Sequence, residues 1–207
     1  MPEPDIKTPE DTIVDALVAC GYAVVPDYIP SEQIVQMRSE LERLRASGQM
    51  RRAGIGKAAE VSVSDHTRGD FIYWLDDGAP IDAARSYLDR LEALRLSVNQ
   101  SLALGLFEFE GHYALYPPGA FYRKHLDQFH SDTRRTLTTI LYLNENWQES
   151  DGGQLRIYPD GNEMERHLDI SPVGGTFVTF LSARLWHEVL PATRDRSSIT
   201  GWFKTRT

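Results

Sequence analysis

Helix-like and strand-like hydrophobic patterns alternate along the beginning of the chain. Apolar positions between Thr8 and Gly21 recur every three or four residues, and this spacing predicts an amphipathic helix. Thr8 precedes a proline and two acids, a typical helix start, and Gly21 is a typical helix stop. The apolar run at 22–25 predicts a short strand, and a second helical pattern covers residues 30–47.

Residues 48–70 have a different texture from their neighbours. Glycines are spread among charged and polar residues there, and only Val61 and Val63 alternate as they would in a strand. Long loops without a core of their own are often lids or binding loops, although a plain surface excursion explains this texture equally well. A strand at 71–75 and the longest helix, at 80–104, are predicted to follow.

From residue 105 onward the hydrophobic period changes from helical to strand-like. Turns rich in glycine and proline separate eight short β-like runs, at 106–116, 121–125, 136–143, 154–158, 167–170, 176–181, 185–190 and 197–204. Many short strands at this spacing indicate a sandwich or barrel. Helices first and strands later predict an α+β chain in which the N-terminal helices brace a sheet. No repeat or linker divides the sequence, so we expect a single domain over residues 1–207.

Composition and charge narrow the range of partners. With 41% hydrophobic and 25% charged residues, the 207-residue chain has the composition of an ordinary globular protein. Its formal charge of −8 argues against broad binding to nucleic acid. No apolar run approaches the length of about 20 residues that a membrane helix needs. Residues 1–5 lack the features of a secretory signal, and Cys20 is the single cysteine, which favours a reducing, cytoplasmic compartment.

A His-x-Asp pair, His125 and Asp127, lies at the end of a strand-like run that begins at residue 113. Side chains two apart on a strand face the same side, so both can point into the mouth of a barrel. His187 lies in another strand-like run and can complete the set. Two imidazoles and one carboxylate are the ligands of a facial-triad, non-haem Fe(II) oxygenase site. Arg196, nine residues beyond His187, suits the far carboxylate of a dicarboxylate co-substrate.

Zinc hydrolysis is the competing use of the same ligand types. The sequence has no His-Glu-x-x-His helix, and a zinc hydrolase would leave Arg196 unexplained. Glu188 points away from its neighbour His187 on a strand and is expected to lie outside the ligand set. The other histidines lack a neighbouring acid at ligand spacing, so we expect them to be structural or exposed: His66, His112, His130 and His167.

Longer motifs surround these residues. They are Tyr116-Pro117, 122–127, 140–147, 152–159, 187–192 and 196–202, together with Arg68-Gly69-Asp70 followed by Ile72 and Trp74. In these motifs the chain resembles the Fe(II)/2-oxoglutarate oxygenases. Within them it is most similar to the prolyl hydroxylases related to the oxygen-sensing enzymes that modify hypoxia-inducible factor, in a compact bacterial-type form. The resemblance runs from Gly21 to the C-terminus and is strongest at 113–204.

This resemblance implies a double-stranded β-helix, a jelly-roll or cupin-like core, over residues 105–207. Residues 1–104 would provide helical support and the substrate loop. The resemblance further implies the following roles: His125, Asp127 and His187 as iron ligands; Arg196 paired with the 5-carboxylate of 2-oxoglutarate beside a hydrogen bond from Tyr142; Tyr116, Thr200 and Trp202 lining the co-substrate pocket; and Tyr122 near the iron and the substrate.

The loop that contains Arg68, Gly69 and Asp70 would close over the substrate, again by resemblance. A charge at the hinge of such a loop needs a partner on the barrel. We therefore expect Asp70 to form an ion pair with Arg135.

The activity implied by the resemblance is hydroxylation of a prolyl residue in a protein, by analogy at C4, with release of succinate and CO2. Fe(II), 2-oxoglutarate and O2 would take part, ascorbate would stimulate, and no side chain beyond the metal ligands would act as an acid or base. The bacterial-type form makes a translation factor such as elongation factor Tu an expected substrate. Two alternatives remain open: an oxygenase acting on a free amino acid or other small molecule, and a non-enzymatic metal-binding jelly roll.

Overall fold

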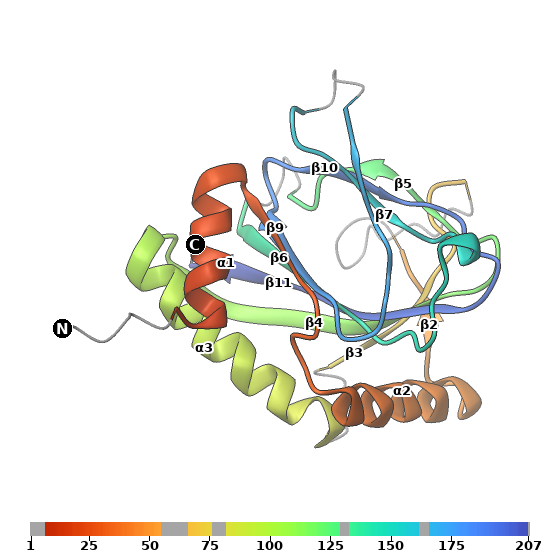
Figure 1. The fold of residues 1–207 in the computed structure, drawn as a ribbon. Coiled ribbons are helices and arrows are strands. Elements are labelled where there is room, and N and C mark those ends of the chain that lie inside the picture. The colour runs from red at the N-terminus through yellow and green to blue at the C-terminus, as the bar shows by residue number, and fades with distance from the viewer. Residues whose placement is uncertain (1–6, 55–65, 76–81, 129–132, 162–165, 207) are drawn as a thin grey trace.

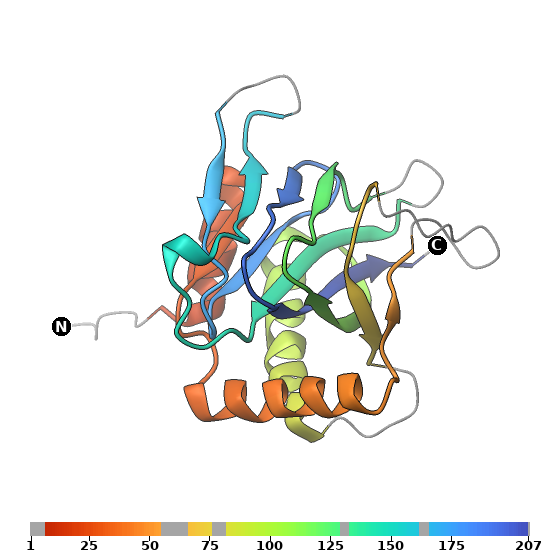
Figure 2. The ribbon, with the colours of Figure 1, turned by 90° about the vertical axis from the view of Figure 1, so that its right-hand side faces the viewer.

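The computed structural model describes residues 7–54, 66–75, 82–128, 133–161 and 166–206. In these residues three α-helices stand on one side of a large antiparallel sheet, and a smaller sheet stands on the other side (Figure 1). The helices are α1 (Pro9–Cys20), α2 (Ser31–Ala46) and α3 (Arg85–Leu102). α2 runs beneath the sheets (Figure 2) and contacts the 3-10 turn that leads into α3. None of the described helices is long and apolar enough to cross a membrane.

The predicted helix ends agree with the local capping interactions. Thr8 and Asp11 form a reciprocal capping box at the start of α1, and Gly21 follows its end with a φ of +83°. Such a left-handed conformation is accessible to glycine at little cost, which is why the helix stops there. α3 begins later than predicted, because a short 3-10 turn at Asp82–Ala84 precedes it; residues 80 and 81 lie outside the described part of the chain.

The described strands form two sheets in which every neighbouring pair is antiparallel. The large sheet has the order β1 (Tyr22–Val25), β9 (Phe177–Leu181), β6 (Arg135–Tyr142), β11 (Arg196–Thr205), β4 (Leu106–Tyr116), β3 (Phe71–Trp74) and β2 (Arg51–Arg52). The small sheet has the order β5 (Tyr122–His125), β10 (Trp186–Val189), β7 (Leu155–Tyr158) and β8 (Leu168–Ile170). Two facing antiparallel sheets braced by helices confirm the predicted α+β jelly roll.

Apolar side chains alternate along the large sheet, so both of its faces are buried. On β4, Tyr113 and Leu115 belong to a hydrophobic cluster shared with the helices. Their neighbours Ala114 and Tyr116 belong to a second cluster, shared with the small sheet. The helices therefore close one face of the large sheet, and the space between the two sheets is left for a ligand site.

The eight β-like runs predicted beyond residue 105 all form strands, with boundaries within one residue of those expected. The long loop predicted at 48–70 is described only in part, and Val61 and Val63 lie outside the described residues. Arg51 and Arg52 within it form β2, which pairs with β3. β2 escapes prediction because its two exposed arginines carry no hydrophobic alternation.

Candidate metal and co-substrate site

The small sheet brings His125, Asp127 and His187 together. His125 ends β5 and pairs directly with His187 on β10. One ligand atom from each of the three residues lies within 4.8 Å of the others. The Nε2 atom of His125 is 3.5 Å from Asp127 Oδ1, and that of His187 is 3.6 Å from Asp127 Oδ2. The three side chains thus converge on one point between the sheets.

Backbone carbonyls fix the orientation of both imidazoles. Nδ1 of His125 lies 2.7 Å from the carbonyl oxygen of Arg123, and Nδ1 of His187 lies 3.0 Å from that of Leu185. A carbonyl oxygen only accepts hydrogen bonds, so Nδ1 carries the proton in each neutral ring. The Nε2 lone pairs are then free to coordinate a metal, as second-shell hydrogen bonds commonly arrange.

The protonation states suit a divalent cation. Burial acts to raise the pKa of Asp127, but the nearby His187 and His125 outweigh it and hold that pKa well below its usual range. Burial and the neighbouring His125 lower the pKa of His187 to about 4. Asp127 is also fixed by Thr138, whose Oγ1 donates to Oδ2 at 2.8 Å. A charged carboxylate and uncharged imidazole are the forms that bind metal, and this donor set fits Fe(II).

Arg196 is a buried cation at the start of β11. Its Nε donates to the carbonyl oxygen of Gly153 at 2.8 Å, and its Nη2 lies 3.5 Å from the hydroxyl of Tyr142. Among the described residues no carboxylate forms an ion pair with it. Because a buried charge without a counter-ion is unfavourable by several kcal/mol, this guanidinium is prepared for an anion from outside the chain.

The metal-ligand candidates and Arg196 line the same pocket between the sheets. Four other predicted residues line it as well: Tyr116, Tyr122, Thr200 and Trp202. Tyr142 is fully buried behind the pocket, with its hydroxyl towards Arg196. The sequence therefore identified residues that lie far apart along the chain but meet in one cavity.

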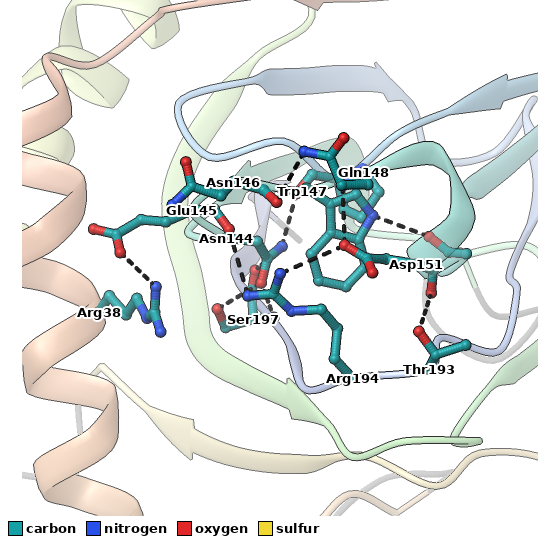
Figure 3. A network of polar contacts seen from close by, with 12 residues as sticks. Arg38, Asn144, Glu145, Asn146, Trp147, Gln148, Asp151, Thr193, Arg194 and Ser197 are labelled. Atoms are coloured by element: carbon teal, nitrogen blue, oxygen red, sulfur yellow. Dashed lines mark hydrogen bonds and ion pairs between the residues drawn. The ribbon is translucent and has the colours of Figure 1, made fainter.

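A polar network surrounds the start of β11 and holds the backbone next to Arg196 (Figure 3). The Asn144 side chain accepts from the backbone N–H of Ser197 at 2.7 Å and donates to its carbonyl at 3.1 Å. Trp147 Nε1 donates to the carbonyl of Gly152 at 3.1 Å, which anchors the turn that supplies the Gly153 carbonyl. The guanidinium is therefore oriented by fixed backbone.

The predicted ion pair between Asp70 and Arg135 is wrong. Asp70 is buried and forms two hydrogen bonds with Arg68, at 2.7 and 2.6 Å, a planar arrangement that Arg68 can reach from two residues away. Arg135 instead pairs with Glu110 at 2.8 Å and lies 3.6 Å from the centroid of the Trp202 ring. Arg68 lines the pocket, and its guanidinium carbon lies 4.3 Å from the centroid of the Tyr122 ring, whereas Gly69 and Asp70 are not among the residues that line the pocket.

His112 is a pocket residue whose place the sequence did not reveal. It is buried, lines the pocket and lies outside the group of candidate metal ligands. Its position two and four residues before Ala114 and Tyr116 on β4 was the available signal, because these residues share a face. His66 and His167 are exposed, and His130 lies outside the described residues. Glu188 faces away from the site and accepts from the Tyr158 hydroxyl at 2.5 Å.

Comparison with known proteins identifies related chains. The sequence profile of the 2OG-Fe(II) oxygenase superfamily matches residues 111–204. The chain is 35% identical to a hypoxia-inducible factor prolyl hydroxylase of Caenorhabditis elegans over 92% of its length. It is 30% identical to the human prolyl hydroxylase EGLN3, over 92% of this chain and 81% of the relative. It spans 27% of the length of the Caenorhabditis elegans enzyme and 48% to 60% of the length of the human, rat and mouse Egl nine homolog 1.

Two solved structures share the fold over almost the whole chain. A Pseudomonas putida prolyl-4-hydroxylase has 42% sequence identity and a TM-score of 0.84, covering 96% of this chain and all of the other. A prolyl hydroxylase from Trichoplax adhaerens, in complex with a hypoxia-inducible factor peptide, has 28% identity and a TM-score of 0.82. That match covers 94% of this chain and 88% of the other.

Proposed function

Since the chain belongs to the prolyl hydroxylases of the 2OG-Fe(II) oxygenase superfamily, we propose that its substrate is a prolyl residue in a protein. One observation of the site carries most weight. A buried arginine without a carboxylate partner among the described residues lines the same pocket as two histidines and an aspartate that converge. This pairing of a cation with a metal-ligand set suits the two ends of 2-oxoglutarate.

In this proposal His125, Asp127 and His187 hold Fe(II). When bound, Fe(II) with 2-oxoglutarate and O2 supplies the oxidising power to place one oxygen atom in a C–H bond, with succinate and CO2 as co-products. These three side chains would leave part of the metal's coordination sphere open to other molecules. The chain itself supplies orientation and the exclusion of water, and none of its side chains has to act as a general acid or base.

Arg196 and Tyr142 bind the 5-carboxylate of 2-oxoglutarate at the deep end of the pocket. The guanidinium keeps its Nε on the Gly153 carbonyl, which leaves Nη atoms for the carboxylate. Tyr116, paired with Arg196 across β4 and β11, and Thr200 line the way to the metal ligands. Burial raises the pKa of Tyr142, so its hydroxyl stays protonated and can donate.

The rim of the pocket supports a protein rather than a small-molecule substrate. Arg68 is held by Asp70 against Tyr122 and forms an isolated β-bridge with it, which fixes this rim next to the metal ligands. An extended peptide can lie across such a rim with its proline in the pocket. The Trichoplax adhaerens prolyl hydroxylase was solved in complex with a peptide fragment of hypoxia-inducible factor, which supports a protein substrate for this chain. Elongation factor Tu is our candidate for a bacterial-type substrate, and hydroxylation at C4 is our candidate reaction.

The substrate class is tested with the Fe(II)-loaded protein, 2-oxoglutarate and O2. Elongation factor Tu, a panel of proline-containing peptides and free L-proline are offered in parallel, and each is analysed by mass spectrometry. We expect a gain of about 16 daltons, one oxygen atom, on a prolyl residue of a protein or peptide. A gain confined to free proline or another small molecule would contradict the proposal and favour the small-molecule oxygenase. Ascorbate is included in one series, where it is expected to increase turnover.

A further inference from the structure

His112 is a buried polar residue that packs against two indole rings. Its ring lies edge-on to Trp74, with centroids 4.8 Å apart, and 5.4 Å from the centroid of Trp202. Only 3% of its surface is exposed, and Nδ1 has no hydrogen-bond partner among the described residues. Leaving a buried polar atom unpaired destabilises the folded state. Such an atom calls for an explanation, and a role in binding or catalysis is one.

The neighbouring Trp202 shows the same feature. Its Nε1 is also buried and lacks a partner among the described residues. Both rings line the pocket that contains the candidate metal ligands and Arg196. Three other buried polar atoms without a partner among the described residues, the hydroxyls of Tyr28, Tyr87 and Tyr113, do not line this pocket. The place of His112 and Trp202 in the pocket lining, and not the missing partner alone, therefore points to an oxygen-bearing occupant.

Strand register locates His112 along the pocket. Thr138, which holds Asp127, pairs across the sheet with Trp202 and so marks the metal end. His112 pairs with Thr200, which lies two residues, or about 7 Å, closer to Arg196 along β11. His112 therefore faces the part of the pocket between the metal ligands and Arg196, on the side nearer the metal ligands.

The imidazole is uncharged at this position. Burial, followed by the nearby Arg68 and Arg135, lowers the pKa of His112 to about 3. A neutral ring has one N–H donor and one acceptor nitrogen. It can donate a hydrogen bond to a carboxylate or carbonyl oxygen without adding a further positive charge to a pocket lined by three arginines, Arg68, Arg135 and Arg196.

We propose that His112 hydrogen-bonds to the 2-oxo acid end of 2-oxoglutarate, its C1 carboxylate and C2 carbonyl, and so orients this end against the metal ligands. This inference rests on the proposed function, in which Arg196 binds the opposite end. His112 and Arg196 then recognise different parts of the same molecule, and their contributions to binding can be separated.

The first test measures binding without turnover. The dissociation constants of 2-oxoglutarate and of 2-oxobutyrate, which lacks the distal carboxylate, are determined anaerobically with Fe(II) bound. His112→Met is expected to raise both dissociation constants by the same factor, about tenfold for the loss of one hydrogen bond to a charged group. His112→Gln, which keeps an N–H donor, should recover part of this loss. His167→Met makes the same chemical change at an exposed histidine and should leave both constants unchanged.

Arg196→Met separates this inference from the proposed function. It should weaken the binding of 2-oxoglutarate but leave the binding of 2-oxobutyrate unchanged. If it does not change the affinity for 2-oxoglutarate, the proposed function itself is contradicted. If Arg196→Met behaves as expected and His112→Met binds both acids like the parent, only the role of His112 is overturned. If His112→Met lost affinity for 2-oxoglutarate but not for 2-oxobutyrate, His112 would contact the distal carboxylate instead of the 2-oxo acid end. This result would also overturn the proposed role of His112.

Stability distinguishes a binding role from a structural one. Without ligands, His112→Met should unfold at the same denaturant concentration as the parent or at a higher one, because it removes an unpaired buried nitrogen. Lower stability with unchanged affinity would make His112 a core residue and contradict the inference. Should the variant not fold, ¹⁵N-histidine NMR of the unmodified Zn(II)-loaded protein decides: addition of 2-oxoglutarate must shift the ring nitrogens of a buried, neutral histidine, and unchanged signals overturn the proposal.

Discussion

Asp127 shows how single residues around the pocket set the chemistry of the site. Its carboxylate is buried between two imidazoles and keeps its charge because these rings and Thr138 stabilise the ionised form. The Thr138 hydroxyl also forms a buried hydrogen bond with the Ser182 hydroxyl, with their oxygen atoms 2.8 Å apart. Thr138 touches no proposed substrate and acts through the orientation of Asp127.

We predict that Thr138→Val lowers metal affinity by about 10- to 100-fold, the usual effect of removing a hydrogen bond to a metal ligand. Titration of the metal-free protein with Fe(II) or Mn(II) measures this directly. Thr139→Val is the matched control, because its hydroxyl is equally buried but bonds to the Gly201 carbonyl. Equal metal affinities in the two variants would show that Thr138 does not position Asp127.

At the scale of elements, Arg196 depends on a turn from elsewhere in the chain. Gly152 and Gly153, just before β7, have positive φ values of +72° and +69°. A Cβ atom added at Gly153 would lie 2.9 Å from the Cβ of Ala192 and 3.2 Å from the Cδ of Arg196. The turn therefore needs glycine both for its backbone conformation and for the close approach of the arginine.

Gly153→Ala is expected to weaken 2-oxoglutarate binding by about tenfold or more, because it displaces the guanidinium from its charged partner. Gly161→Ala is the control, since Gly161 also has a positive φ, +92°, but no atom lies within 4 Å of an added Cβ. Both variants should lose stability from backbone strain. Calorimetric titration with 2-oxoglutarate would contradict this account if the two variants bound it equally well.

Three strands of the large sheet are joined by one charge cluster. Glu110 on β4 pairs with Lys204 on β11 and with Arg135 on β6, each at 2.8 Å. Burial acts to raise the pKa of Glu110, but Lys204 and Arg135 outweigh it, so this pKa lies below its ordinary value of 4.5. A carboxyl group whose pKa is lowered by folding stabilises the folded state at pH values above its unfolded-state pKa. This contribution disappears as the pH falls through the folded-state pKa.

Glu110→Gln should therefore reduce the free energy of unfolding by about 1 kcal/mol at pH 7. The difference from the parent should shrink as the pH is lowered below 4.5. Urea unfolding across this range provides the measurement. Glu108→Gln removes the more exposed partner of Lys204 and should have the smaller effect. A Glu110→Gln effect that is independent of pH would mean that the charge of Glu110 does not contribute.

At the scale of the whole molecule, the site joins two layers that have separate roles. The small sheet supplies His125 and His187, whereas the large sheet supplies Arg196, Thr200 and Trp202. A metal and a co-substrate bound between the sheets therefore contact both layers. Ligands that bind only the folded state stabilise it, by about 2.7 kcal/mol at a concentration of 100 times Kd.

We predict that Fe(II) or Mn(II) together with 2-oxoglutarate raises the melting temperature by about 5–10 °C at such concentrations. A chelator should reverse the shift. Arg196→Met should keep the metal-dependent part and lose the part due to 2-oxoglutarate. Differential scanning fluorimetry measures both parts, and a melting temperature that neither ligand changes would argue against a site between the sheets.

Patterns of period two allowed much of this molecule to be predicted from its sequence. Alternating apolar residues located the strands, and the same alternation placed His125 and Asp127 on one face. The partner of Asp70 could not be predicted in this way, because the choice between Arg68 and Arg135 depends on the path of the chain in three dimensions. For His112 the alternation with Ala114 and Tyr116 was the available signal, but which residues it faces in the pocket follows only from the register of β4 with β3 and β11.

The most direct test of the central claim is the ratio of two products in one reaction. The Fe(II)-loaded protein is mixed anaerobically with 2-oxoglutarate and a protein substrate, exposed to O2, and assayed for succinate and for hydroxyprolyl residues. Our account predicts one succinate for each hydroxylated prolyl residue, with both products lost in His125→Ala. Succinate without any hydroxylated prolyl residue would contradict prolyl hydroxylation, and the absence of succinate with metal bound would contradict the oxygenase activity itself.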